Sequence, residues 1–236
     1  MINYGKICIG TFKSYYREAM FQSEKQRSYN IVVMTPFHKD QVVKHLVDTY
    51  ITDPVAEWMF PNPKTREKYF TKYIEAATKF GILYGTSYVA LLPYKKGEEP
   101  KVIGALILMY PGFHLGFLPQ LNVGVFNLIY KIPPISFIRF FYYTEFIEKT
   151  REQLAPEPHW RGCFVAVDEK YRYEGVQGDF ITILRTGADL THTACYLETA
   201  KPEIVRFYRF IGFYVQKEIV VPWGGPRVWL LKRDAK

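Results

Sequence analysis

The final third of the chain constrains the fold most, because strand and helix patterns alternate there with only short turns between them. Residues 163–167, CFVAV, form an uninterrupted apolar run, which is typical of a central strand covered on both faces. A helical apolar stripe follows at residues 176–187, and residues 193–199, TACYLET, alternate as a strand does. Strands joined through a helix require a crossover connection, so this order predicts a mixed α/β sheet.

The rest of the pattern fits the same class of fold. A second helical stripe at residues 204–211 stops at Gly212, and two strand patterns flank Gly224 and Gly225 as a closing hairpin. The other expected elements are a strand at residues 30–36, helices at 42–50 and 69–80, and a hairpin whose strands, 86–94 and 101–110, flank the charged turn KKGEEP.

The sequence predicts one domain with an extension. Residues 1–29 are polar and basic with few clear periods, and we interpret them as an N-terminal extension to a single domain at 30–236. Residues 111–155 are rich in large apolar side chains but are interrupted by prolines, and their apolar runs are too short for a membrane span. We expect one or two buried helices in this segment; the alternative is a pocket wall or a membrane-touching surface.

Composition and charge narrow the functional classes. The formal charge of +8 suits nucleic acid, anionic lipid or a polyanionic cofactor, but the basic residues form no long run, so we expect no nucleic-acid partner. The N-terminus lacks the apolar stretch of a signal peptide, which favours a cytoplasmic location. Cys8, Cys163 and Cys195 have neither disulfide nor zinc spacing, and the histidines show no ligand pattern, so we expect no metal.

The turn after the apolar run has the make-up of an anion site. A strand that ends at Val167 and a helix that opens near Gly175 bring unpaired N–H groups together at the positive end of the helix dipole. Glycine allows close approach to a phosphate, and Arg172 could add a bidentate contact. Strand–glycine–helix turns are common, however, so the spacing alone leaves open whether this turn binds a phosphate.

Five short strings occur in an order that resembles a known superfamily. They are HWRGCFVAVDE, RYEGVQG, CYLET, RFYRFIGF and GGPRVWLLKR, between residues 159 and 233. Together they resemble the GNAT superfamily of N-acetyltransferases, in particular the branch that contains puromycin N-acetyltransferase. YITDPVAEWMFPNPKTREKYF, upstream, is similar to the family's first helices. The resemblance implies an α/β fold with a mixed, mostly antiparallel sheet of about seven strands and helices on both faces.

The resemblance also implies a site and a reaction. Acetyl-CoA would be the acyl donor, a small-molecule primary amine the acceptor, and transfer would be direct in a ternary complex. The segment 111–155 would line the acceptor side, and the protein would be a monomer or a homodimer. The cofactor-binding residues implied are the backbone of Val165 and Val167, the loop residues Arg172, Glu174, Gly175, Gln177 and Gly178, and the cation Lys201.

Two residues are implied to carry the chemistry. Tyr208 matches the family tyrosine that protonates the leaving sulfur, and a phenol with a pKa of about 10 has that proton at neutral pH. Glu198 is the candidate general base, near the end of an otherwise apolar strand. Tyr208 could instead be a core residue and Glu198 a structural carboxylate. His159 is a second candidate base or a residue that orients the acceptor.

The match departs from the family pattern at several positions. Gln177 stands where the family has glycine or alanine, and Ala200, Lys201 and Ile204 replace a serine and two asparagines that help bind the cofactor. These departures motivate an alternative function, a non-catalytic acyl-CoA-binding protein with a degenerate loop. A third possibility is a peripheral membrane acyltransferase that reaches lipid through the apolar segment.

Overall fold

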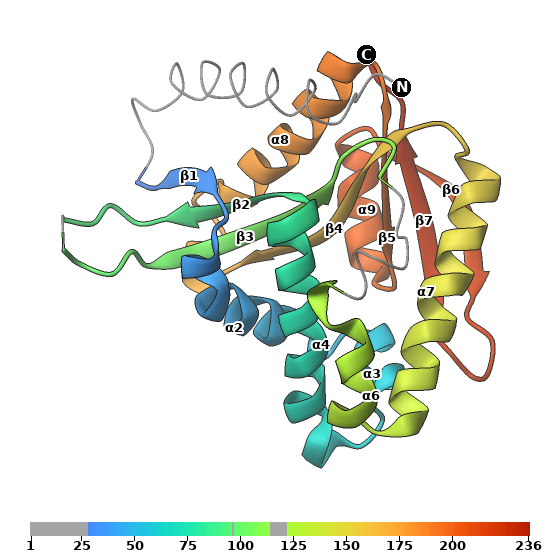
Figure 1. Cartoon of the computed structure of the whole chain (residues 1–236). Helices are drawn as coiled ribbons and strands as arrows, with labels where there is room; N and C mark the ends of the chain where they lie inside the picture. The colour runs from blue at the N-terminus through green and yellow to red at the C-terminus, as the bar shows by residue number, and fades with distance from the viewer. Residues whose placement is uncertain (1–27, 96, 114–121) are drawn as a thin grey trace.

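The computed structural model describes residues 28–95, 97–113 and 122–236 (Figure 1). A seven-stranded sheet lies at its centre, in the order β1-β2-β3-β4-β5-β7-β6. Its strands are β1 (Asn30–Val33), β2 (Thr86–Leu91), β3 (Val102–Met109), β4 (His159–Val167), β5 (Ala194–Thr199), β6 (Tyr214–Val220) and β7 (Arg227–Arg233). The expected extension, apart from its last two residues, lies outside the described residues, as do residues 114–121 of the expected apolar segment.

The sheet is mixed and mostly antiparallel, as the resemblance implied. Only β4 and β5 are paired in parallel, across the connection through helix α8 (Val176–Thr191). The hairpin of β2 and β3 and the closing hairpin of β6 and β7 are both confirmed. A chain that alternates strand, helix and strand can place the second strand beside the first only through such a crossover.

A gap opens in the middle of the sheet. β4 and β5 pair from His159 with Ala194 to Gly162 with Leu197, and no further. Beyond that point β4 stays with β3 as far as Val167, whereas β5 stays with β7. The apolar run 163–167 was expected to be covered on both faces. This was wrong for every residue but Ala166, because the others are half-buried and border the cavity at the gap.

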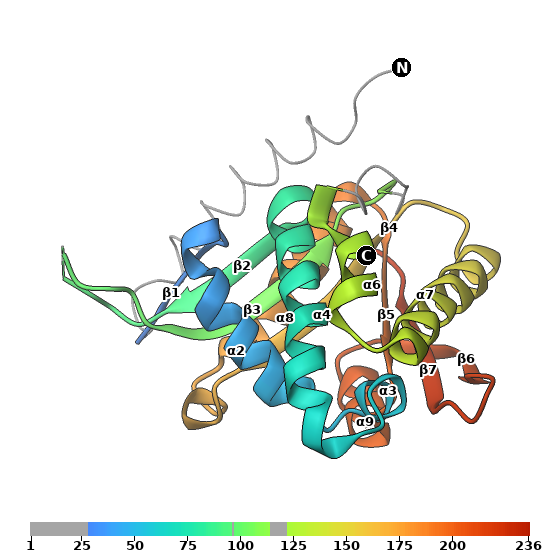
Figure 2. The same cartoon turned by 60° about the horizontal axis from the view of Figure 1, so that its bottom comes forward.

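One face of the sheet has helices from the first two thirds of the chain. In Figure 2, α2 and α4 cross this face together, and α6 lies beyond α4. The apolar stripe of α2 is buried against the sheet, and Asn62 caps the start of α4, where Pro63 occupies the first turn. The helices are α2 (Lys39–Tyr50), α3 (Pro54–Met59), α4 (Pro63–Tyr84), α6 (Leu128–Lys131) and α7 (Pro134–Leu154), with the 3-10 turns η2 (Pro36–His38) and η3 (Val125–Asn127).

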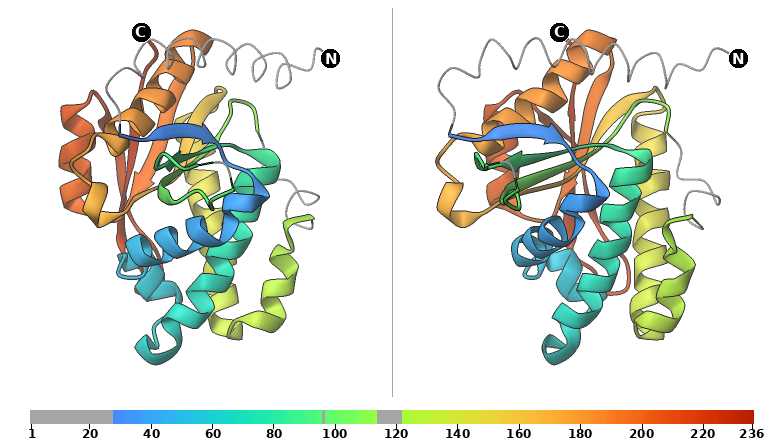
Figure 3. Two further views of the ribbon diagram at one scale, coloured as in Figure 1. Left: turned by 90° about the vertical axis from the view of Figure 1, so that its left-hand side faces the viewer. Right: turned by 60° about the vertical axis from the view of Figure 1, so that its left-hand side comes forward.

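The opposite face has two helices from the final third, α8 and α9 (Pro202–Phe210) (Figure 3). Buried residues of α8, among them Phe180 and Ile183, pack on the sheet in a second apolar cluster. Gly175 precedes α8 and Gly212 follows α9, and both have positive φ angles, 88° and 96°. Glycine adopts such angles without the steric cost that a side chain would add, so both helices begin or end where the sequence predicted.

The apolar segment is mostly helical from residue 122 to 154, but the expectation that its helices are buried was wrong. They lie at the surface with one side packed inward, and Ile129, Tyr130, Ile135 and Ile138 are exposed. Its long helix α7 is held against the closing hairpin, because Tyr142 stacks on Trp223 with ring centroids 4.0 Å apart. In the first half of α7, Arg139 donates a hydrogen bond to the backbone oxygen of Trp58 in α3, at 2.5 Å. None of the helices in the described part of the chain is both long enough and apolar enough to cross a membrane.

Candidate active site

A cavity of about 1090 Å³ follows the gap between β4 and β5. At one end it reaches Arg172 and Gln177, beside the start of α8. At the other end it reaches Glu148 of α7 and Glu198 of β5. Aromatic side chains supply much of the wall at that second end, namely Tyr73, Phe80, Phe140 and Tyr143. The cavity therefore joins a helix N-terminus to a group of buried charged residues.

The turn before α8 presents backbone donors. The first hydrogen bond to Gly175 runs from the N–H of Asp179 to the Gly175 oxygen at 3.0 Å. The N–H groups of the three residues between them, Val176, Gln177 and Gly178, belong to the first turn, where a helix offers no acceptor. A Cβ added at Gly178 would meet no other heavy atom within 4 Å, so space is open beside this turn. The structure thus gives the turn the geometry of an anion site.

The side chains around this turn differ in what they contact. Arg172 is exposed and lies on the cavity wall, with Glu169 as a distant partner at 4.0 Å. Glu174 instead accepts a hydrogen bond from the hydroxyl of Ser28 at 2.5 Å. Lys201 precedes α9 and also lines the cavity. Arg172 and Lys201 are thus the predicted cations with access to a ligand in the cavity.

The two β4 residues predicted to bind the cofactor arm, Val165 and Val167, both line the cavity. At Val165 the relevant groups are already used. The hydroxyl of Tyr50, at the end of α2, donates to the Val165 oxygen at 3.1 Å and accepts from the Val165 N–H at 3.1 Å. Burial raises the pKa of Tyr50 to about 12, so the phenol keeps the proton that it donates.

Tyr208 lies on the buried side of α9 and lines the cavity, with a residue exposure of 9%. Its ring meets those of Phe207 and Phe213 edge to face, at 5.4 and 5.2 Å between centroids. Burial raises the pKa of Tyr208 above its usual value, and the nearby Tyr50 adds to the effect. Tyr208 is therefore a protonated phenol beside the gap, and both of its expected roles, core residue and proton donor, fit this position.

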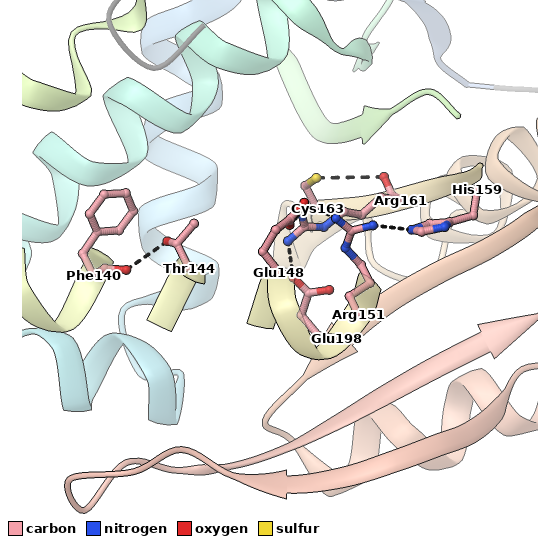
Figure 4. Close-up of polar contacts among 8 residues, drawn as sticks. All are labelled: Phe140, Thr144, Glu148, Arg151, His159, Arg161, Cys163 and Glu198. Carbon is pink, nitrogen blue, oxygen red and sulfur yellow. Dashed lines mark hydrogen bonds and ion pairs between the residues drawn. The ribbon is translucent and has the colours of Figure 1, made fainter. Parts of the chain in front are cut away.

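Glu198 belongs to a chain of buried charges (Figure 4). Arg161 of β4 donates to Glu198 Oε1 at 2.9 Å and to Glu148 Oε2 at 3.0 Å. The other oxygen of Glu148 pairs with Arg151, which also donates to His159 Nε2 at 2.6 Å. Two carboxylates and two guanidinium groups balance in charge, as buried ions require.

One oxygen in this chain of charges has no partner. Glu198 Oε2 is buried and makes no hydrogen bond to another described residue. Burial opposes the charge of Arg161, but Glu198 and Glu148 outweigh it and raise the Arg161 pKa, so Arg161 stays a cation. A buried carboxylate oxygen without a donor is costly, and an ammonium group that entered the cavity would supply one.

His159 is engaged at both ring nitrogens. Nδ1 lies 2.7 Å from the backbone oxygen of Glu157, which can only accept, so Nδ1 carries the proton. Nε2 then accepts from Arg151, and burial lowers the pKa of His159 and keeps the ring neutral. The structure places His159 as a support for Arg151, with no free nitrogen to act as the base that was considered.

The two described cysteines are protonated thiols. Cys163 borders the cavity, and burial raises its pKa to about 11. Cys195 is buried on β5, and burial raises its pKa to about 12. A nucleophilic cysteine needs a lowered pKa, so neither thiol has the environment that covalent transfer would need.

Comparisons with known proteins identify the fold but no relative by sequence. No family model and no curated protein sequence matches the chain. Solved structures do match. The structure of histone acetyltransferase HPA2 and related acetyltransferase from Corynebacterium glutamicum has a TM-score of 0.59 and 18% identity, covering 89% of this chain and 97% of its own. The fold is that of the GNAT acetyltransferases.

Two further structures share this GNAT fold. A mutant of agmatine N-acetyltransferase in its apo form has a TM-score of 0.59 and 13% identity, over 88% of this chain and 99% of its own. Arylalkylamine N-acetyltransferase 2 from Aedes aegypti has a TM-score of 0.53 and 14% identity, over 89% and 100%. At these identities the likeness concerns the fold.

Four residues of the candidate site were not predicted from the sequence, namely Tyr50, Glu148, Arg151 and Arg161. Arg161 had a signal, because a charged residue in a strand that enters a core needs a partner. The other three come from helices α2 and α7, and no local pattern in the sequence connects them with β4.

Proposed function

We propose that the protein is an acetyl-CoA-dependent N-acetyltransferase that transfers an acetyl group directly to the primary amine of a small molecule. The observation that carries this proposal is the single cavity through the gap between β4 and β5. It connects the free N–H groups of α8 with the unpaired, buried oxygen of Glu198. A donor and an acceptor could therefore meet inside one space, without a covalent enzyme intermediate.

The donor end binds phosphate. The first turn of α8, entered through Gly175, offers backbone N–H groups and the positive end of the helix dipole. Arg172 and Lys201 add positive charge along the cavity, and the backbone of Val167 and Val165 lies beside the cofactor arm. Acetyl-CoA supplies the activated acyl group as a thioester. Gln177 lies on the cavity wall, so its side chain also borders the path of the cofactor.

The acceptor end binds a cation. Glu198 Oε2 accepts a hydrogen bond from the ammonium group and takes its proton, while Arg161 holds the other oxygen in place. The rings of Tyr73, Phe140 and Tyr143 form an apolar, electron-rich wall that suits an amine with a hydrophobic body. By their names, two proteins of the same fold acetylate agmatine and arylalkylamines.

Tyr208 acts at the sulfur. Its hydroxyl makes no hydrogen bond to another described residue, and its raised pKa keeps the phenol protonated at neutral pH. The phenol gives this proton to the sulfur as the carbon–sulfur bond breaks, so that the thiol leaves in its neutral form. Glu198 takes the first proton from the ammonium group, and the second N–H proton, lost after the nitrogen attacks the carbonyl carbon, replaces the one that Tyr208 gave. One proton is therefore released for each acetyl group transferred.

One observation favours the alternative, a non-catalytic acyl-CoA-binding protein. The Tyr50 hydroxyl holds the Val165 backbone groups, and Ala200 and Ile204 replace side chains that could hydrogen-bond to a cofactor. Under this alternative the turn before α8 still binds phosphate, but no acyl group reaches Glu198.

Calorimetric titration with acetyl-CoA and with CoA, followed by a thiol-release assay over a panel of amines, tests both functions. Micromolar binding together with amine-dependent release of CoA is the expected result. Binding without release for any amine would support the non-catalytic alternative. No binding of either nucleotide at millimolar concentration would overturn both.

A further inference from the structure

The contact between Tyr50 and Val165 bridges two layers of the fold. Val165 lies three residues beyond Gly162, the last β4 residue that pairs with β5, so β5 no longer covers this edge of β4. On the other side β4 remains paired with β3, where Val165 is opposite Leu106. The Tyr50 hydroxyl therefore serves as the missing neighbour of β4, because it both donates to and accepts from the same residue.

The Val165 N–H cannot serve two partners. A backbone N–H has one hydrogen to donate, and a buried N–H without an acceptor costs free energy, so it stays paired in any stable state. A ligand carbonyl that approached Val165 would need the hydrogen that Tyr50 accepts. The contact and the ligand are thus mutually exclusive at Val165.

We propose that Tyr50 is an internal competitor of the acyl donor: its hydroxyl pairs with the Val165 N–H and C=O until an amide or thioester carbonyl of the donor replaces it at the N–H. We call this contact the Tyr50 latch. The inference rests on the proposed function, because it takes acetyl-CoA as the ligand that opens the latch.

The Tyr50 ring lies between the apolar core and the cavity. Tyr50 is the last residue of α2 and is half-buried, packed in part against the core. One edge of its ring packs against Phe164 with centroids 5.3 Å apart, and the open space beside it is the cavity. Tyr50, Glu198 and Tyr208 all line the cavity, so the latch faces the same space as the two groups that carry the proposed chemistry.

The latch lowers donor affinity, since part of the binding free energy is used to release Tyr50. Tyr50→Phe keeps the ring and its packing but removes the hydroxyl. We expect acetyl-CoA to bind this variant about five- to tenfold more tightly than the wild type in calorimetric titration, because the net worth of such hydrogen bonds is modest. The matched control is Tyr94→Phe, which removes an exposed phenol outside the cavity and should leave the affinity unchanged.

Hydrogen exchange at the Val165 amide gives an independent readout. Without ligand, this amide should exchange faster in Tyr50→Phe than in the wild type, and acetyl-CoA should restore its protection in both. Wild-type binding with equal or weaker binding by Tyr50→Phe would overturn the latch and leave the proposed function standing. If neither protein binds acetyl-CoA or CoA, the proposed function fails and the latch fails with it. Thermal unfolding of each variant shows whether the fold is kept.

Discussion

The two ends of the cavity are built in different ways. The phosphate-binding turn of the donor end is made of backbone from one short stretch of chain, residues 172–178, where a glycine turn starts a helix. The acceptor end is made of side chains from four separate elements, with Tyr73 on α4, Glu148 on α7, Arg161 on β4 and Glu198 on β5. One end is local in sequence, and the other exists only after folding.

The difference explains which substitutions each end tolerates. Every residue but proline has an N–H, so a backbone site keeps its donors when a side chain changes, as at Gln177. A side-chain site has no such reserve. Replacing Glu198 or Arg161 removes the donor or acceptor itself and leaves a buried partner unpaired. We expect variants at the acceptor end to have the larger effects.

The largest effect is expected for Glu198→Gln. The amide keeps the shape and can still accept from Arg161, but it cannot take a proton, so turnover should fall about 10²-fold or more. Steady-state kinetics with a reactive amine measures the loss. Glu152→Gln is the control, because Glu152 is exposed on α7 and lies outside the cavity. Equal turnover in both variants would remove Glu198 from the mechanism.

Tyr208→Phe should lower turnover by about 10²-fold while donor affinity changes little, because only the proton for the leaving sulfur is lost. Turnover numbers and calorimetric dissociation constants for acetyl-CoA separate the two effects. A variant as active as the wild type would leave Tyr208 as a core residue of α9 only.

At the donor end, Gly175→Val should weaken acetyl-CoA binding by more than tenfold. Gly175 has a φ of 88°, which a β-branched residue adopts only with strain of about 1–2 kcal/mol, so the turn would refold and redirect its N–H groups. Gly224→Val is the matched control, since Gly224 also has a positive φ, 69°, but lies in the closing hairpin outside the cavity. We expect it to introduce similar backbone strain and to leave the affinity near normal. Unchanged affinity in Gly175→Val would show that this turn binds no phosphate.

The smallest effect is expected for His159, which accepts a hydrogen bond from Arg151 of the acceptor end. Because its pKa is lowered in the folded state, the neutral ring stabilises the fold above the unfolded value of about 6.5. This contribution to stability is lost as the pH falls from about 6.5 through the lower pKa that His159 has in the folded state. Urea unfolding at pH 7.5 and 5.5 should show a smaller difference for His159→Gln than for the wild type. An equal difference in both proteins would mean that His159 does not titrate with folding.

Most of the fold was predictable from the sequence, and the site less so. Local patterns predicted α2, α4, α8 and α9, helix in the apolar segment, the two hairpins and the turn at Gly175, because periodicity and glycine act within a few residues; they did not predict the short α3. The gap beside Val165 was not predictable in this way. It depends on where β4 stops pairing with β5, which neighbouring strands decide.

The sequence by itself determined the order of the elements, the glycine turn and the positions of Glu198 and Tyr208 on their strand and helix. Tertiary structure alone decided that Arg161 holds one oxygen of Glu198 and that Tyr50 closes the edge of β4 at Val165. The physical reason is the separation in sequence over which each kind of interaction acts. Secondary structure follows from interactions between near neighbours in the chain, whereas these contacts join residues 37 and 115 positions apart, which only the packing of helices on the sheet brings within hydrogen-bond distance.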